Sequence, residues 1–405
     1  MYNPNAVVTI GENTTTGVEG IANWTATNVN TACSGSGNTT CGYSQPYAVT
    51  LRSGQFAYVF GTSNNIYVFA YNSTTGVLNP VGSVDSYGSN QVGMAISIDG
   101  NYVYLVDQAQ SAIKSFAVDS DGMLTYIESI PTGNSPSASS LRFDPTGKYL
   151  YSSAAGAQNI TVFSYNSING HLTQQSTISS GAHPSFMSFT PNGKYLYVSN
   201  DLGVVPPTVV SNDARISMYQ VQPNGDLSAL SPESSIKSLD NNPFASIVDP
   251  SGKYLYVTNV GPLSAGMQYA TNTLTIFSIN QATGALSYNP AQNLAQVESA
   301  PVAIITDPLG KYMYVANGVS GSISQLSVDP KNGSVLPLTP ATVNSGVTPV
   351  SLIFSPDKKF VYSVSQYGNF IQMYNYSAVT GQLTPNGSPI PTGSATQSGF
   401  ILFGN

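Results

Sequence analysis

Apolar and polar positions repeat along the chain as short β-type runs separated by tight turns. An apolar run that begins at or near a proline leads into an Asp-Pro-x-Gly-Lys type turn, and Tyr-Leu-Tyr-Val follows, as in residues 249–257. Proline fixes φ at the start of such a turn, and glycine accepts the left-handed conformation that a hairpin requires. The aromatic and β-branched residues of the second run suit a sheet buried on both faces. Each unit therefore predicts an antiparallel hairpin.

The hairpin unit occurs in seven copies with a period of about 46 residues. In each copy a third run of the Ile-Tyr-Val-Phe type follows, and a second glycine turn leads to a short outer run. Four antiparallel strands repeated radially are the blades of a β-propeller. We expect an all-β, seven-bladed propeller over residues 46–405, preceded by an N-terminal extension of residues 1–45. The copies lie at residues 52–59, 97–104, 144–151, 190–198, 249–257, 307–315 and 355–362.

Two irregularities interrupt the repeat. Eight segments qualify as innermost strands of seven blades, because residues 46–51 and the C-terminal residues 397–403 compete for one place. Three arrangements are open: the C-terminal strand closes the ring, the N-terminal arm helps to build a partial eighth blade, or the arm pairs with a neighbouring subunit. The second irregularity is a pair of inserts at 199–215 and 259–273, which we expect side by side on one face. Long loops on a rigid scaffold often have a function; the alternative is that these inserts are decorative or form a contact between subunits.

Composition narrows the class of protein. Charged residues make up 8% of the chain against about 25% in an average domain, while hydrophobic residues make up 41%. The net charge of −7 and the absence of a basic run exclude a typical nucleic-acid-binding protein. The longest apolar runs are only strand-sized, so we expect no transmembrane segment. The sequence does not start with positively charged residues followed by an apolar stretch, as a signal peptide does. We expect a secreted protein that is numbered without its signal peptide.

The two cysteines of the chain, Cys33 and Cys41, fall in the N-terminal extension. No histidine lies near them to complete a metal site, so we expect a small disulfide loop of a secreted protein, no bound metal and no cofactor. Eight Asn-x-Ser/Thr sequons permit glycosylation, but their number is what chance gives in so Asn- and Ser-rich a chain.

The repeat has a recognisable family likeness. The Asp-Pro-x-Gly-Lys-Tyr-Leu-Tyr-Val-x-Asn units, which read Tyr-Val-Thr-Asn literally at 256–259, resemble the YVTN repeat of seven-bladed propellers. This repeat is found in the lactonase-like (6-phosphogluconolactonase-like) family and in surface proteins. The resemblance spans about residues 46–403. It is specific for the fold and much less so for function, since one fold hosts many activities.

The same resemblance supplies candidate site residues. It implies an active-site histidine in the stretch that holds His183, and residues 200–203 resemble the Asp-Leu-Gly segment that follows it. The Arg and Glu that relatives carry in the next blade are missing here. Lactone hydrolysis needs a base and a group that stabilises the oxyanion, and the candidates are His183, Asp201 and Arg215. Arg142 lies inside an inner strand and is not counted. The alternative is that His183 only caps a turn between blades.

These observations favour a secreted, non-enzymatic propeller that serves as an extracellular structural, surface or adhesive subunit. We expect it to associate with itself or with other surface proteins, through its N-terminal arm or its surplus strand, with a glycan as a further possible partner. Two alternatives stay open: a lactonase-like hydrolase with a site near His183, and a module that binds glycan or peptide on the face of the inserts. The paired tyrosines, such as Tyr149 and Tyr151, recur in nearly every unit, so packing between blades explains them better than carbohydrate stacking.

Overall fold

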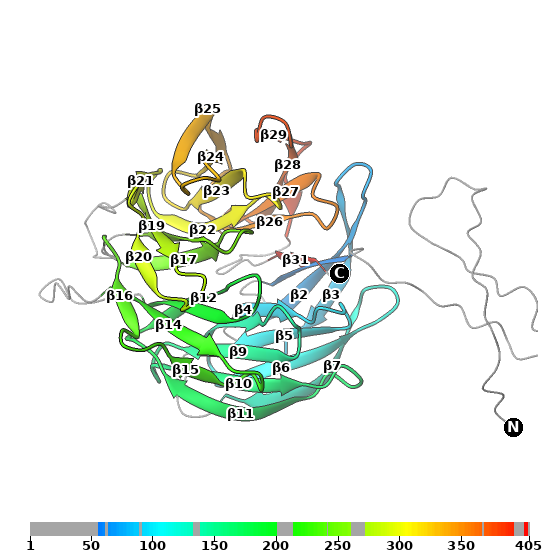
Figure 1. Cartoon of the computed structure of the whole chain (residues 1–405). Coiled ribbons are helices and arrows are strands. Elements are labelled where there is room, and N and C mark those ends of the chain that lie inside the picture. Colours follow the sequence, from blue (N-terminus) through cyan, green and yellow to red (C-terminus); the bar gives the residue numbers. More distant parts are fainter. Residues whose placement is uncertain are drawn as a thin grey trace, which may run out of the picture. The chain divides into compact units, whose positions relative to one another are not determined.

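The described residues of the computed structural model form seven antiparallel sheets arranged as the blades of a propeller (Figure 1). They comprise residues 56–60, 64–88, 91–132, 138–200, 214–240, 242–260, 272–366, 368–392 and 401–403. No helix occurs in these ranges, and none there could span a membrane. The prediction of an all-β, seven-bladed propeller is confirmed. The extension 1–45, with Cys33 and Cys41, and the segment 46–51 lie outside the described residues, so the disulfide and secretion stay predictions.

Each blade follows the strand order that the repeat predicts. In blades 4, 5 and 7 the outer strand is interrupted and forms two short pieces. Blade 1 contains β1 (Phe56–Phe60), β2 (Asn65–Tyr71), β3 (Leu78–Asp85) and β31 (Ile401–Phe403); blade 2 contains β4 (Gln91–Ile96), β5 (Tyr102–Asp107), β6 (Ala112–Val118) and β7 (Leu124–Pro131); blade 3 contains β8 (Ala138–Phe143), β9 (Tyr149–Ala154), β10 (Asn159–Tyr165) and β11 (Leu172–Ser179); blade 4 contains β12 (Pro184–Phe189), β13 (Tyr195–Asn200), β14 (Arg215–Val221), β15 (Leu227–Ala229) and β16 (Ser235–Lys237). Blade 5 contains β17 (Pro243–Val248), β18 (Tyr254–Asn259), β19 (Thr273–Ile279), β20 (Leu286–Tyr288) and β21 (Leu294–Gln296); blade 6 contains β22 (Pro301–Thr306), β23 (Tyr312–Asn317), β24 (Ser322–Val328) and β25 (Val335–Asn344); blade 7 contains β26 (Pro349–Phe354), β27 (Phe360–Ser365), β28 (Phe370–Tyr376), β29 (Leu383–Pro385) and β30 (Ile390–Pro391).

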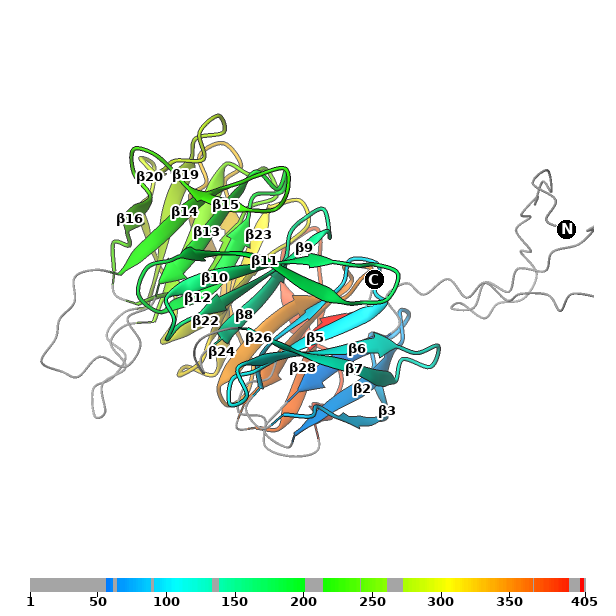
Figure 2. The same ribbon diagram turned by 90° about the horizontal axis from the view of Figure 1, so that it is seen from below.

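The ring is closed by the C-terminal strand. β31 pairs antiparallel with β1, with Ala57 opposite Phe403 and Val59 opposite Ile401, and so completes blade 1. The inner strands β31, β4, β8, β12, β17, β22 and β26 then contact one another in a closed circle around the axis. Figure 2 shows the blades that follow one another from β14 through β10 and β6 to β2 around this circle. Of the three arrangements left open by the sequence, the structure therefore has the first.

Hydrophobic packing lies between the blades. Seven clusters of buried residues are present, and each is shared by two neighbouring blades. The cluster of blades 1 and 7, for example, joins Ala57 and Phe69 to Tyr362 and Val364. Burial of apolar side chains contributes about 25 cal/mol per Å². The ring is therefore held by contacts that each blade makes with both neighbours, the last and the first included.

The tyrosines of the repeat fasten each blade to the next one. The second aromatic residue of every Tyr-x-Tyr unit is fully buried, and its hydroxyl donates a hydrogen bond to the carbonyl of the glycine that closes the outer turn of the next blade. The first aromatic ring lies against the same glycine, so that a Cβ on Gly284 would come within 2.3 Å of Tyr195. Packing, and not carbohydrate stacking, is thus the role of both residues. The pairs are Tyr58–Gly122, Tyr104–Gly170, Tyr151–Gly225, Tyr197–Gly284, Tyr256–Gly333, Tyr314–Gly381 and Tyr362–Gly76.

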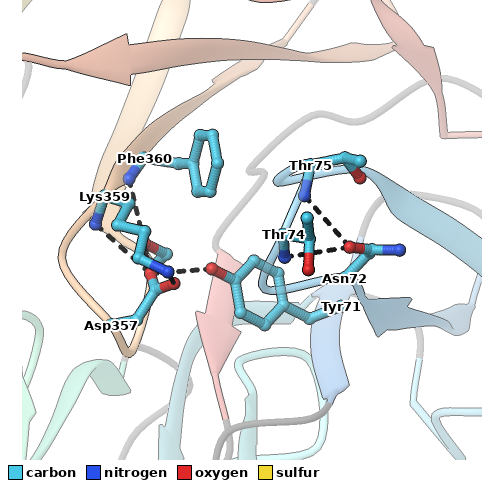
Figure 3. Close-up of polar contacts among 8 residues, drawn as sticks. Tyr71, Asn72, Thr74, Thr75, Asp357, Lys359 and Phe360 are labelled. Atoms are coloured by element: carbon cyan, nitrogen blue, oxygen red, sulfur yellow. Dashed lines mark hydrogen bonds and ion pairs between the residues drawn. The ribbon is translucent and has the colours of Figure 1, made fainter. Parts of the chain in front are cut away.

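A polar contact adds to the junction of blades 7 and 1 (Figure 3). Tyr71 Oη donates a 2.7 Å hydrogen bond to Asp357 Oδ1, which also accepts from Ser355 Oγ at 2.6 Å. Lys359 Nζ lies 3.4 Å from Asp357 Oδ2. Burial alone raises the pKa of the Asp357 carboxyl, but the hydrogen bonds from Ser355, Tyr71 and Lys359 outweigh it and lower that pKa below its usual value. The carboxylate form is therefore the one that suits the closed ring.

Candidate functional site

His183 stands where the chain enters the inner strand of blade 4. Its backbone is left-handed, with φ at 53°, and the residue is exposed, whereas Pro184 directly after it is buried. Asn242, Ala300 and Thr348 hold the same left-handed place before the prolines of blades 5, 6 and 7, with φ of 51°, 57° and 51°. Since alanine and threonine occupy it elsewhere, the backbone of this turn does not require an imidazole.

A β-bulge follows each of these entries. The register shifts between Pro184 and Phe186 in blade 4, and the same shift recurs at the start of β17, β22 and β26. Bulges and left-handed residues re-aim side chains at the ends of strands, and both are common beside active sites. The turn is thus a repeated structural device, and blade 4 uses it to place a histidine at the end of the strand.

Asn200 fixes the strand ends around His183. It lies opposite Pro184 on one side and Arg215 on the other. Its Nδ2 donates to Arg215 O at 3.0 Å and to Ser217 Oγ at 2.9 Å, while its Oδ1 accepts from Ser180 Oγ at 3.1 Å. One buried amide thus joins the connection that carries His183 to β13 and β14.

Two other YVTN-type asparagines also bond to the third strand of their blade. Asn259 Nδ2 donates to Thr275 Oγ1 in β19 and its Oδ1 accepts from Ser238 Oγ; Asn317 Nδ2 donates to Ser324 Oγ in β24. Asn200 and Asn259 therefore fasten the strand ends of a blade to the connection from the blade before it, whereas the bonds of Asn317 stay within its own blade.

The structure brings two of the three sequence candidates to the same end of blade 4. His183 precedes β12 and Arg215 begins β14, with only β13 between these strands. Arg215 Nε donates to Ser235 Oγ at 2.7 Å, so part of the guanidinium is held toward the outer strand β16. Asp201, the third candidate, lies outside the described residues, as do most residues of both inserts. The strands that flank the inserts belong to the adjacent blades 4 and 5.

Two charged residues near this site were not selected from the sequence. Asp240 lies in the connection from blade 4 to blade 5, where its Oδ2 accepts a 2.8 Å hydrogen bond from Thr273 Oγ1 at the start of β19. Only the topology, and no motif, brings Asp240 to this end. Among the described residues no group of three or more His, Cys, Asp and Glu side chains could hold a metal ion.

Arg142 is the second of these residues. It lies in the inner strand β8, and its Nε donates to Met187 O in the neighbouring inner strand β12 at 3.3 Å. Its guanidinium carbon stands 5.4 Å from the centre of the Phe186 ring. Phe186 follows His183 by three residues, about 10 Å along an extended strand. The sequence set Arg142 aside because it is inside a strand, but the structure brings its charge beside the strand that His183 precedes.

Comparison with known proteins gives a consistent result. The sequence profile of the family described as "Lactonase, 7-bladed beta-propeller" matches residues 8–343 and 290–400. A 6-phosphogluconolactonase of Formosa agariphila is 27% identical over 305 residues, which cover 70% of this chain and 80% of the relative. The 6-phosphogluconolactonase of Serratia proteamaculans is 24% identical over 272 residues, 64% of this chain and 74% of the relative. The structure of the periplasmic gluconolactonase of Pseudomonas aeruginosa superposes with a TM-score of 0.69 at 16% identity, covering 86% and 99% of the two chains, which shows a shared fold.

The comparisons contradict one expectation. From its low charge and surplus strand the sequence suggested a non-enzymatic structural, surface or adhesive subunit. The matched family and the curated relatives carry the names of enzymes, so this interpretation is wrong. Low charge and a surplus strand are properties of the scaffold, and they say nothing about a site of a few side chains. The alternative that the sequence left open, a lactonase-like hydrolase, agrees with the comparisons.

Proposed function

The chain belongs to the family of seven-bladed β-propeller lactonases, and we propose that it is a hydrolase that opens a small lactone ring with water. The observation that carries this proposal is the place of His183. Its exposed imidazole stands at the end of blade 4 where β14 begins with Arg215 and where Asp240 lies in the connection to blade 5.

The reaction needs one proton acceptor and one stabiliser of negative charge. A neutral nitrogen of the His183 imidazole takes a proton from water while the water oxygen attacks the carbonyl carbon of the lactone. The carbonyl oxygen becomes an oxyanion, which a guanidinium such as that of Arg215 stabilises. The bond to the ring oxygen then breaks, and the ring oxygen takes the proton from His183. The product is the open hydroxy acid, and one water is consumed.

The substrate class follows from the relatives. Those proteins are named for 6-phosphogluconolactone and gluconolactone. We therefore place the substrate among sugar lactones. No metal or cofactor is needed for the steps above.

The test compares hydrolysis of sugar lactones by the protein and by H183N. Asparagine accepts the left-handed backbone, as it does at residue 242, but it cannot act as the base. We expect H183N to lose activity by about 100-fold or more, with unchanged thermal unfolding. T348N is the matched control, because Thr348 has the same conformation in blade 7, away from the site. The rate must exceed spontaneous ring opening; a protein that accelerates no sugar lactone, or an H183N variant as fast as the parent, would refute the proposal.

A further inference from the structure

The inner strands, which surround the axis of the propeller, carry one charged side chain. β4, β8, β12, β17, β22, β26 and β31 together contain a single ionisable side chain, that of Arg142. The other residues of these strands are apolar, hydroxylic, glycine, proline or glutamine. The guanidinium of Arg142 is therefore the one charged group that these seven strands offer to a ligand.

Arg142 is held in place but keeps most of its donors unused. Its Nε–H is taken by Met187 O, and its face lies near the Phe186 ring. Among the described residues its Nη1 and Nη2 atoms have neither a hydrogen-bond acceptor nor a carboxylate partner. The residue nevertheless remains exposed to solvent. A fixed guanidinium with free N–H groups presents the fork that binds carboxylate and phosphate oxygens bidentately.

The surroundings strengthen this charge. Arg142 is open to solvent on one side, but the inner strands of blades 3 and 4 take part of the water away from its guanidinium; this desolvation lowers its pKa, and no charged neighbour contributes. An anion that binds there replaces some of its hydrating water by the N–H donors of the guanidinium. Electrostatic attraction beside the protein is stronger than in bulk water. The net charge of the protein is −7, so the attraction is local to this place and not a property of the whole surface.

We propose that Arg142, with Phe186 and the carbonyl of Met187 as its supports, forms an oxyanion-binding site at the inner edges of β8 and β12. The ligand is a small sugar acid or sugar phosphate whose anionic group meets the free face of the guanidinium. Reading this ligand as the substrate or product of hydrolysis rests on the proposed function. On that reading the site selects anionic sugar lactones, since Arg142 lies beside the strand that His183 precedes.

Calorimetric titration tests the site without any turnover. The probes are 6-phosphogluconate, gluconate and inorganic phosphate, each with the unaltered protein, R142Q, R142K and K194Q. We expect R142Q to weaken binding of 6-phosphogluconate by about 10- to 100-fold, as loss of a charge-assisted bidentate contact does. R142K retains the positive charge but not the two parallel N–H donors, so its affinity for 6-phosphogluconate should lie between those of the parent and R142Q. K194Q loses an exposed turn lysine, and hence the same charge, and should bind as the parent does.

The outcomes separate the two proposals. Competition by inorganic phosphate identifies the phosphate as the bound group, and binding of gluconate that phosphate does not displace identifies the carboxylate. If R142Q binds the probes as tightly as the parent, or the parent binds none of them, the anion site is refuted even where hydrolysis of neutral lactones is found. If Arg142-dependent binding persists in a protein that hydrolyses no lactone, the proposed function fails and the anion site stands. Unfolding curves of R142Q and R142K show whether both variants are folded.

Discussion

The hydroxyl of Tyr362 donates a hydrogen bond to the carbonyl oxygen of Gly76, 286 residues earlier in the chain. This bond joins blade 7 to blade 1 and repeats, at the closing junction, the contact that fastens every other pair of neighbouring blades. The junction is thus built like the other six on its outer side. Its inner side differs, because β31, from the far end of the chain, supplies the inner strand of blade 1.

Removal of residues 393–405 should therefore weaken the ring. The deletion takes β31 from the edge of β1 and exposes the backbone and side chains of residues 57–59, which are buried in the intact protein. We expect a loss of about 3 kcal/mol or more of unfolding free energy, measured by denaturant titration. Deletion of residues 404–405 alone is the control and should change little. Equal stability of both truncated chains would mean that β31 does not hold blade 1.

The ring tyrosines predict a sharp alkaline limit. Burial raises the pKa of the phenols of Tyr104, Tyr151, Tyr197, Tyr256, Tyr314 and Tyr362 above the usual value of about 10. Since the folded pKa is raised, their contribution to stability is complete below pH ~10 and is lost as the pH rises through the folded values. Each such group costs about 1.4 kcal/mol per pH unit above pH ~10. The loss summed over these six tyrosines approaches the whole unfolding free energy of a typical domain within one to two pH units.

We therefore expect cooperative unfolding between about pH 10 and pH 12. Tyrosinate absorbance and near-ultraviolet circular dichroism should change together, because the buried phenols ionise only when the ring opens. The Y256F variant serves as the comparison: it removes one titrating group and should shift the alkaline midpoint upward relative to its own neutral-pH stability. A buried-tyrosine absorbance change that precedes loss of the fold would contradict this account.

The fold could be predicted because its signals are local and repeated. Each turn residue and each Tyr-x-Tyr pair acts within one blade or on the next, so one unit read seven times defines the ring. Closure was not predictable, since residues 46–51 and 397–403 both have strand-like sequences and the choice between them depends on a pairing across the whole chain. His183 was found through a family likeness. Arg142 and Asp240 were missed because their neighbours come from other blades, as with Met187, 45 residues beyond Arg142.

The acid side of the stability profile should depend on the contact between Tyr71 and Asp357. The pKa of the Asp357 carboxyl is lowered in the folded protein, so its contribution to stability is present above the ordinary carboxyl pKa of about 3.9 and is lost as the pH falls through the folded value. Y71F removes one donor and should raise that pKa toward its ordinary value, as followed by carboxyl carbon NMR. Y376F, which removes the equivalent contact to Asp307, should leave the Asp357 titration unchanged. An unaltered titration in Y71F would show that the other donors alone set the pKa.

The buried amide oxygen of Asn317 lacks a donor, and the repeat explains why. In the part of the chain that the structure describes, Asn317 Oδ1 is buried without a hydrogen-bond partner, whereas the equivalent oxygens of Asn200 and Asn259 accept from Ser180 and Ser238. The corresponding place before blade 6 holds Val297. Its backbone N–H donates to Asn272 O, just before β19, as the N–H of Ser238 donates to Ala214 O, just before β14, but the side chain of valine cannot donate.

Replacement of Val297 by threonine should satisfy that oxygen. A hydroxyl at this place donates to Asn317 Oδ1, and the remaining methyl group keeps part of the packing against the core of blades 5 and 6. We expect V297T to gain about 0.5–1.5 kcal/mol of unfolding free energy relative to V297A. The reverse experiment, S238A, removes an existing donor to Asn259 and should cost about 1–3 kcal/mol. Both changes in unfolding free energy are measured by denaturant titration at neutral pH. If V297T were no more stable than V297A, its hydroxyl would not reach the amide, and the unpaired oxygen would need another explanation.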